Sequence, residues 1–207
     1  MGLTANQTRA LYPAWATRFV EEREALIALD GKVGDSDLGI TMSKGFAAAR
    51  DAVEAAPEAD IAGQMKLAGA ALAKAAPSTM GTLMATGFLR GFKAQEGTTQ
   101  FGTPEAARFW RAFADGVQQR GKAQVGDKTV LDVLDPIAKA LEAHTGALPE
   151  ALETAVTAAA EALEATRDMV AQHGKAAAFQ EKSRGLADAG GTVALMLIEV
   201  MRDVVRA

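Results

Sequence analysis

Three aspartates lie within a stretch of eight residues in the segment LDGKVGDSDLGITMSKGF, residues 29–46. They are Asp30, Asp35 and Asp37, and glycines lie among them. Carboxylates that gather at one flexible place repel one another unless a cation lies between them. Three carboxylates in a turn supply the oxygen ligands that hard cations such as Mg²⁺ prefer. The segment therefore predicts a metal site, and an equally good interpretation is that Asp35 and Asp37 cap a helix beside a solvated Asp30.

A calcium-binding EF-hand loop does not fit this spacing. Such a loop needs a glycine at its sixth position and a glutamate at its twelfth. Counting from Asp30 gives Asp35 and Thr41 at these positions, and counting from Asp35 gives Ile40 and Phe46. The segment suits Mg²⁺ better, because this ion takes a few carboxylates, keeps some waters and shares phosphate oxygens.

Two further segments combine glycines with hydroxyl groups. In PSTMG, residues 77–81, Ser78 and Thr79 could hold a phosphate, although a helix N-cap is the commoner role of such residues. In RGKAQVGDKT, residues 120–129, the two glycines would let a flat ligand lie against the backbone, and Asp127 and Thr129 could cap the next helix.

Several lysines and arginines accompany these loops. Lys122 and Lys128 could face a phosphate, but a solvated position is commoner for lysines. The segment HGKAAAFQEKSRGLADAGGT, residues 173–192, is long for a connection in a compact domain, and such connections are often lids or binding segments. A disordered surface excursion is the alternative interpretation of this segment.

The composition argues against several function classes. The formal net charge is −4 and the sequence pI is near 5.3, which disfavours a nucleic-acid or membrane partner held by net charge. The chain has no cysteine, and neither histidine belongs to a pattern typical of nucleophilic catalysis. We therefore expect no catalytic nucleophile. The sequence also lacks a long apolar run and a signal-peptide core, so we expect a cytoplasmic protein with no membrane partner.

Helices must position these loops, because apolar residues recur at three-four spacing along most of the chain. We predict eight helices in one domain that covers residues 1–207. They span about residues 6–29, 39–55, 61–75, 80–92, a fifth from 103, 129–143, a seventh from 149 with apolar periodicity to 170, and 191–205. Pro13 is expected to kink or interrupt the first helix. Thr103 is the expected N-cap of the fifth helix, with Pro104 at its first position.

Short connections favour an all-α, antiparallel up-and-down bundle of these eight helices. In such a bundle, the loops after the first, third, fifth and seventh helices lie at the same end. These are the four loops described above, and the remaining loops read as ordinary turns. The N-termini of four helices also point to that end, where their free N–H groups favour anions. The sequence therefore predicts one site at one end of the bundle.

These segments resemble a known family. LDGKVGDSDLGITMSKGF resembles the aspartate signature of the L subunit of dihydroxyacetone kinase, a nucleotide-binding family also found as the C-terminal domain of single-chain kinases. DGVQQRGKAQVGDKTVLDVL is similar to its second signature, and GKAAAFQEKSRGLADAGGTVALM to its C-terminal lid and final helix. The order and spacing fit along essentially the whole chain. The resemblance implies an antiparallel eight-helix barrel with a nucleotide at one end.

The resemblance also implies roles for individual residues. The three aspartates would bind two Mg²⁺ ions that bridge the phosphates of ADP or ATP. The other implied nucleotide-binding positions are Leu38, Gly39, Ile40, Thr41, Thr79, Met80, Gly121, Val130, Lys175, Asp188, Ala189 and Gly190. The chain departs from the family pattern at Leu38, where histidine is common, at Lys175, where arginine is usual, and at Ala189, where the family has proline. The turn at residues 77–80 is also less glycine-rich than usual.

The implied function is that of a phosphotransferase subunit. It would pass a phosphoryl group from the nucleotide to dihydroxyacetone, or a related short ketose, held by a separate K subunit. The subunit would be active only with that partner, and a phosphoryl-donor protein could recharge its ADP. Two alternatives stay open, namely a non-catalytic Mg²⁺–nucleotide module that regulates a partner and a plain helical interaction protein.

Overall fold

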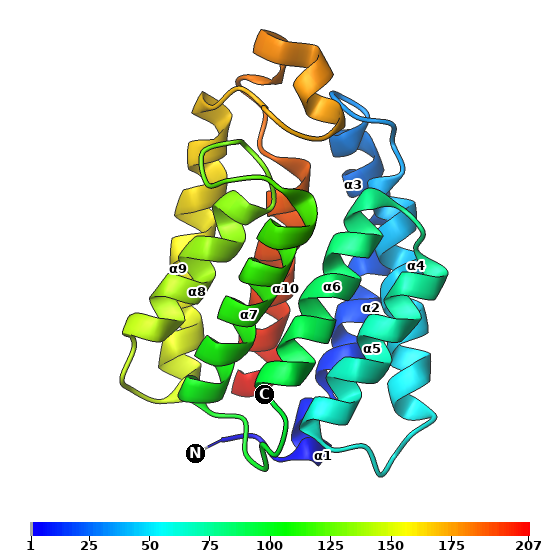
Figure 1. The fold of residues 1–207 in the computed structure, drawn as a ribbon, viewed down its shortest axis with the longest axis vertical. Helices are drawn as coiled ribbons and strands as arrows, with labels where there is room; N and C mark the ends of the chain where they lie inside the picture. The colour runs from blue at the N-terminus through cyan, green and yellow to red at the C-terminus, as the bar shows by residue number, and fades with distance from the viewer. Residues whose placement is uncertain (1) are drawn as a thin grey trace.

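Alanine-rich segments with apolar side chains at helical spacing form the helices of the chain, which run up and down side by side (Figure 1). The structure is a computed structural model and describes residues 2–207. Its α-helices are α1 (Ala5–Thr8), α2 (Leu11–Glu21), α3 (Arg23–Asp30), α4 (Leu38–Glu54), α5 (Ile61–Ala75), α6 (Thr79–Ala94), α7 (Thr103–Gly121), α8 (Leu131–Ala143), α9 (Leu148–Ala165) and α10 (Ala189–Arg206). Two 3-10 helices, η1 (Thr166–Asp168) and η2 (Lys175–Ser183), lie between α9 and α10.

The long helices form a closed ring. Each packs against its neighbour in sequence, from α4 with α5 to α9 with α10, and α10 also packs against α2. When α2 and α3 are counted as one interrupted helix, the ring has eight members, which confirms the predicted all-α antiparallel arrangement. Within the described residues, the strand-like pairing is a single antiparallel bridge between Leu3 and Phe101. None of the helices in this part of the chain combines the length and apolarity needed to span a membrane.

The predicted first helix, residues 6–29, is interrupted in its early part as expected, but the break does not lie at Pro13, and a second break was not expected. It is divided into α1, α2 and α3, with breaks near Ala10 and at Glu22. Pro13 lies in the first turn of α2, where its missing N–H removes no intrahelical hydrogen bond. The break therefore precedes the proline.

Three other helix boundaries differ from the prediction. The helix α7 begins at Thr103 with Gly102 as its N-cap residue, so Thr103 is not the cap, and its hydroxyl donates to the Gly146 carbonyl instead. The helix α8 begins at Leu131 rather than at residue 129. The helix α9 ends at Ala165 rather than near 170, because the chain there turns into η1.

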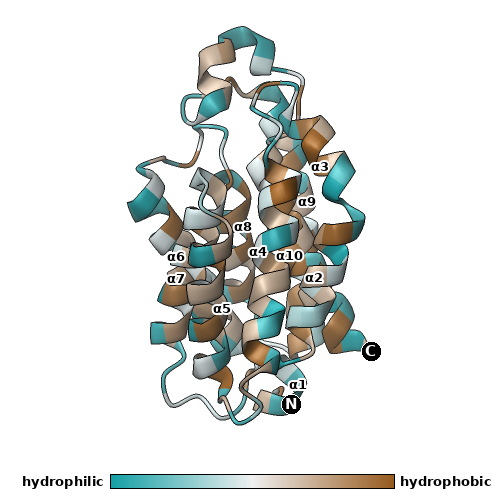
Figure 2. Ribbon diagram, turned by 90° about the vertical axis from the view of Figure 1, so that its right-hand side faces the viewer, coloured by the Kyte–Doolittle hydropathy of each residue, from teal (hydrophilic) through white to brown (hydrophobic). Residues whose placement is uncertain are grey.

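Aromatic side chains fill the interior of the ring. Phe88 of α6 lies edge-on to Phe109 and Phe113 of α7, with ring centroids 5.9 and 5.5 Å away. Two glycines of α6 make room for these rings, since a Cβ at Gly87 would lie 2.4 Å from Phe113 and one at Gly91 would lie 2.4 Å from Phe109. Hydrophobic positions accordingly run along the packed helices, as Figure 2 shows. The glycines let α6 and α7 approach closely.

The loops after α3, α5, α7 and α9 lie at the same end of the ring, and η2 lies beyond them (Figure 1). The loops after α4, α6 and α8 lie at the other end, together with both described chain ends. This arrangement confirms the prediction that the four loops rich in glycine and polar residues lie at the same end.

Candidate functional site

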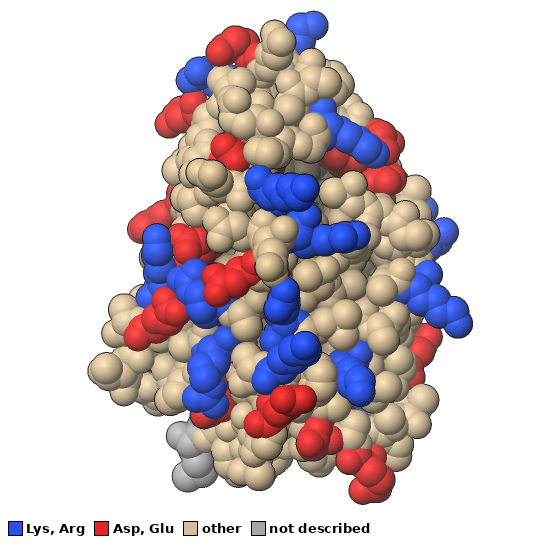
Figure 3. All heavy atoms as spheres, viewed as in Figure 1, with Lys and Arg blue, Asp and Glu red and all other residues tan. Residues whose placement is uncertain are grey.

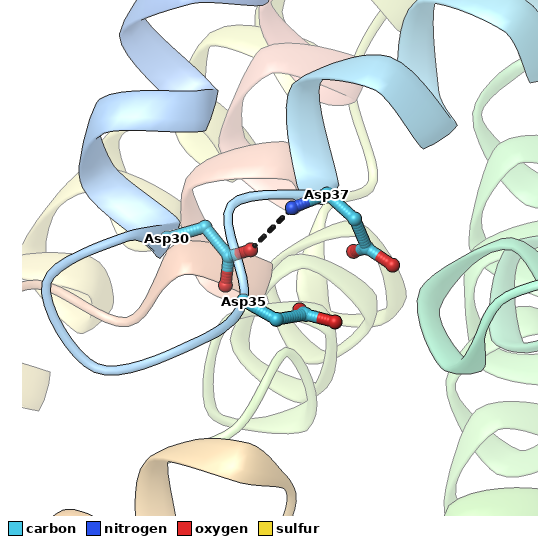
Figure 4. Close-up of side chains that lie close together, drawn as sticks. All are labelled: Asp30, Asp35 and Asp37. Atoms are coloured by element: carbon cyan, nitrogen blue, oxygen red, sulfur yellow. Dashed lines mark hydrogen bonds between the residues drawn. The ribbon is translucent and has the colours of Figure 1, made fainter.

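The three aspartates converge in the turn between α3 and α4 (Figure 4). One carboxylate oxygen from each of Asp30, Asp35 and Asp37 lies within 4.8 Å of those of the other two. Asp30 ends α3, and its Oδ2 accepts hydrogen bonds from the backbone N–H groups of Asp37, at 3.0 Å, and Leu38, at 3.4 Å. The carboxylate of Asp30 therefore holds the N-terminus of α4.

This contact corrects the capping interpretation. Asp37 occupies the N-cap position of α4 but its side chain makes no capping hydrogen bond, and Asp35 lies in the preceding turn. The residue that contacts the N-terminal N–H groups of α4 is Asp30, which was expected to be solvated. Burial is the main cause that raises the pKa of the Asp37 carboxyl, and the negative charge of Asp30 raises it further. A cation between these groups would relieve that repulsion.

Glycines and one left-handed residue shape this turn. A Cβ at Gly34 would lie 2.1 Å from Asp30 Oδ1, so a side chain there would displace the carboxylate. A Cβ at Gly39 would lie 2.0 Å from the Arg23 carbonyl oxygen, which shows how closely α4 packs against α3. Ser36 has a φ of 63°. The glycines thus fix where the three carboxylates lie.

The predicted nucleotide contacts on α4 have different exposures. Leu38 is 4% exposed and belongs to the hydrophobic core. Gly39 and Thr41 are also buried, and Ile40 is half-buried. The first turn of α4 therefore offers the backbone N–H groups of Gly39 and Ile40 rather than long polar side chains, because those of Leu38 and Thr41 donate to Asp30 and to the Asp37 carbonyl.

The start of α6 carries the turn predicted to contact a phosphate. Ser78 Oγ accepts from the Gly81 N–H at 3.1 Å, so the capping interpretation of this serine is confirmed. A Cβ at Gly81 would lie 2.0 Å from the Ala76 carbonyl oxygen. Thr79 is exposed as the first residue of α6, and Met80 is half-buried. Both lie at the same end of the ring as the aspartates.

Asp132 organises the loop between α7 and α8. Its carboxylate is buried and accepts from the N–H groups of Gly126, at 2.5 Å, and Thr129, at 2.7 Å. The sequence analysis did not single out this residue, although Thr129 and Asp132 have the spacing typical of a capping box. The loop is thereby fixed between Gly121, which is exposed, and Val130, which is buried.

Asp127 does not cap α8, contrary to the prediction. Its Oδ2 accepts from the Gln124 N–H at 2.6 Å and lies 3.1 Å from His173 Nε2. The backbone carbonyl of Asp127 also accepts from the Gln172 N–H at 2.9 Å. These contacts join the loop after α7 to the segment after α9.

We define the lid as residues 166–188, the segment that contains η1 and η2. The disordered alternative is wrong, because the segment is folded and contacts the other loops. Lys175 of η2 is exposed and forms an ion pair with Asp35, so the lid reaches the aspartates.

The lid ends at the N-terminus of α10. Asp188 Oδ2 accepts from the Gly191 N–H at 2.6 Å and caps this helix. Ala189 and Gly190 begin that helix, and a Cβ at Gly190 would lie 3.1 Å from Val130 Cβ.

Lys128 was predicted to face solvent or a phosphate and does neither. It is 2% exposed, and its ammonium donates to three backbone carbonyls of the lid. Burial lowers the pKa of this lysine. No signal in the sequence indicates this position, because the acceptors are main-chain atoms 41 to 58 residues away.

Charge and cavities around the site are unevenly distributed. Lys and Arg side chains gather along the face formed by α6 and α7 (Figure 3). The C-terminus of α7 lies at the site end of the ring. Such a surface favours the approach of an anion. A cavity of about 530 Å³ lies at the opposite end, between the start of α7 and the α8–α9 turn. The candidate site is thus assembled from loops at the end of the ring, away from that cavity.

Comparison with known proteins identifies related chains. The family model described as the DAK2 domain matches residues 32–203. The chain is 33% identical over 194 residues to the ADP-binding subunit DhaL of the PEP-dependent dihydroxyacetone kinase of Escherichia coli, covering 90% of this chain and 92% of that protein. It is 34% identical over 203 residues to a D-erythrulose kinase of Mycolicibacterium smegmatis, covering 94% of this chain but 34% of that longer protein.

A solved structure has the same fold. The dihydroxyacetone kinase from C. freundii, crystallised in complex with AMP-PNP and Mg²⁺, matches with a TM-score of 0.73 and 21% identity. The match covers 98% of this chain and 34% of the kinase chain. The helical ring described above therefore corresponds to about a third of that kinase.

Proposed function

This chain belongs to the DAK2 domain family, and from that premise we propose that it binds Mg²⁺ with ADP or ATP as one subunit of a ketose kinase. The observation that carries the proposal is the convergence of three carboxylates within 4.8 Å at the end of the ring where four helices begin. Related proteins named as an ADP-binding kinase subunit and as an erythrulose kinase support a kinase role.

The donor set suits Mg²⁺. Asp35 and Asp37 are not held by backbone hydrogen bonds in the described chain, and Asp30 uses Oδ2 for α4 and keeps Oδ1 for a ligand. Hard oxygen donors of this kind, together with phosphate oxygens, are typical of magnesium–nucleotide sites. We propose two ions here, which when bound offset charge on the phosphates during phosphoryl transfer.

The chain's own residues would bind and orient the nucleotide. The first turns of α4 and α6 would donate N–H groups to the phosphates, from Gly39 and Ile40 and from Thr79 and Met80. Thr41 would lie beside the phosphates, since its own N–H donates to the Asp37 carbonyl. Gly121 and Val130 would line the pocket for adenine and ribose, and Asp188, Ala189 and Gly190 would cover the base. Lys175, which contacts Asp35, would move its ammonium to a phosphate oxygen.

The acceptor would be dihydroxyacetone or a related short ketose held by a K subunit. The name of the E. coli relative describes one subunit of a larger kinase, which supports a division of labour. The similarity to a D-erythrulose kinase supports a four-carbon ketose as an alternative acceptor. A phosphoryl-donor protein that recharges bound ADP is the second proposed partner. No covalent nucleophile is required, because positioning and charge stabilisation supply most of the catalysis in phosphoryl transfer.

Titration calorimetry of ADP with and without Mg²⁺ tests this proposal. Asp35→Asn removes one negative ligand and should weaken Mg²⁺-dependent ADP binding by at least about tenfold. Loss of a residue that only supports a metal ligand already costs about tenfold or more, and loss of a ligand should cost no less. Asp60→Asn is the matched control, since Asp60 caps α5 at the other end and asparagine caps a helix equally well. Equal affinities for the wild type and Asp35→Asn would reject the metal site. Absence of any Mg²⁺-dependent binding would favour a helical interaction protein.

A further inference from the structure

The lid leaves the ring after α9 and returns at α10. It therefore has an outgoing side, which follows α9, and a returning side, which leads into α10. Hydrogen bonds join the two near their bases. The Gly185 N–H donates to the Arg167 carbonyl at 2.7 Å, and the Ala171 N–H donates to Ser183 Oγ at 3.0 Å. These contacts connect the two sides to each other but do not connect the lid to the rest of the ring.

The Asp127 contacts with Gln172 and His173 and the Lys175–Asp35 ion pair join the lid to other loops at its exposed side. Lys128 adds a buried connection from the loop after α7. Its Nζ donates to the carbonyl oxygens of Met169 at 3.1 Å, Ser183 at 2.5 Å and Leu186 at 2.8 Å. Met169 belongs to the outgoing side of the lid, and the other two belong to the returning side. An ammonium has three N–H donors, and all three are used.

The position of this ammonium is costly without its partners. Lys128 is 2% exposed, and a buried charge is tolerated only when it is paired or hydrogen-bonded. If the lid moved away, its carbonyls would leave the lysine, and the ammonium would have to find water. The contacts therefore favour the lid in the position where Lys175 reaches the aspartates.

We propose that Lys128 is a positioning residue that holds the lid over the nucleotide site and links it to the loop predicted to bind the base. The nucleotide part of this inference rests on the proposed function. Opening the lid to release a bound nucleotide would then break three hydrogen bonds to one buried ammonium, in addition to the Asp127 and Lys175 contacts. Loss of the ammonium should mainly speed the release of nucleotide.

The test compares Lys128→Met with Lys122→Met. Methionine keeps an unbranched side chain and removes the charge. Lys122 is an exposed lysine of the same loop with the same φ of 58°, so its variant controls for charge and for left-handed backbone. Without nucleotide, Lys128→Met should increase hydrogen exchange of lid amides by about tenfold or more, while the amides of α10 keep wild-type rates. Lys122→Met should behave as the wild type.

Stopped-flow release of Mg²⁺·ADP gives the second measurement. Lys128→Met should raise the dissociation rate by about tenfold or more and change the association rate much less. A residue that only stabilised the fold would lower the unfolding midpoint and leave this rate unchanged, and that result would overturn the proposal. Wild-type lid exchange in Lys128→Met would overturn it as well.

Amine acylation of the wild-type protein decides the case if Lys128→Met does not fold. Lys128 should react about tenfold or more slowly than Lys122, and slower still with Mg²⁺·ADP bound. Equal reaction of both lysines would contradict the inference. If the wild type does not bind Mg²⁺·ADP, the proposed function fails, whereas lid exchange and acylation without nucleotide still decide whether Lys128 holds the lid.

Discussion

Individual carboxylates at the site end differ in how strongly their surroundings oppose ionisation. Burial is the largest cause that raises the pKa of Asp188 to about 7 from 3.8, and the charge of Asp132 adds to it. The N–H of Gly191 and the charge of Lys128 act in the opposite direction. Asp188 therefore keeps its proton over a pH range in which the same residue is ionised in the unfolded chain.

We predict a pH dependence of stability from this residue. Because the pKa is higher in the folded state, the stabilisation from Asp188 is fully present below about pH 4 and is lost as the pH rises to about 7. Asp188→Asn should remove this contribution and keep the helix cap. Denaturant unfolding without Mg²⁺ should therefore show the wild type losing stability relative to the variant between pH 4 and 7. A difference in free energy of unfolding between the wild type and Asp188→Asn that does not change with pH would contradict the prediction.

Residue types alone predicted part of the site. The spacing of the three aspartates indicated that they meet, because short turns keep them together. The sequence could not show that Asp30 rather than Asp37 contacts the N-terminus of α4, since this depends on how α3 ends. It also could not place Lys128, whose partners are backbone carbonyls of the distant lid.

Helices were easier to predict than their ends. Amphipathic spacing identified the long helices, and the predicted range 61–75 is that of α5. The break at Glu22 was not predicted because the apolar pattern continues across this residue, where the backbone leaves the helical region. The end of α9 was missed because the apolar pattern continues into the lid. Apolar periodicity indicates which residues are buried, and buried residues can continue past the end of a helix.

The packing of α6 against α7 can be tested through Gly87. Alanine gains about 1 kcal/mol over glycine in a helix interior, but overpacking a core costs about 1–3 kcal/mol. A Cβ at Gly87 would lie 2.4 Å from Phe113, which is fully buried and cannot move aside. Because this Cβ would lie within 2.5 Å of three ring atoms of Phe113, we place the cost at the upper part of that range, about 2–3 kcal/mol. We therefore expect Gly87→Ala to lower the free energy of unfolding by about 1–2 kcal/mol in urea denaturation.

Gly121→Ala is the matched control for this comparison. Its Cβ would meet only Leu83, at 3.4 Å, an ordinary contact. The control should leave the free energy of unfolding within about 0.5 kcal/mol of the wild type. If Gly87→Ala proves as stable as Gly121→Ala, the close approach of α6 and α7 is wrong.

At the scale of the whole molecule, the up-and-down rule was sufficient to bring distant loops together. It required only the number of helices and the shortness of their connections. Amphipathic patterns do not show which helix covers α2, so they could not predict that the ring closes. The family resemblance implied this closure. The contacts of α10 with α2 and α9 provide that information.

We predict that this chain alone phosphorylates no ketose. The side chains and N–H groups gathered at the site end suit a magnesium–nucleotide complex, whereas a small sugar needs its own set of convergent hydrogen bonds. Assays with dihydroxyacetone and D-erythrulose should show turnover only after a ketose-binding K subunit is added. Robust turnover by the purified chain alone would reject the division of labour.

The closed ring also constrains the order of events during protein synthesis. Trp15 of α2 donates its indole N–H to the Leu197 carbonyl of α10 at 3.0 Å. Translation makes α10 about 180 residues later, so the part of α2 that packs against α10 remains uncovered on the ribosome until α10 emerges, although α4 can already cover the adjacent part. The helices of the nascent ring therefore form an open arc until α10 is made, and α10 closes it.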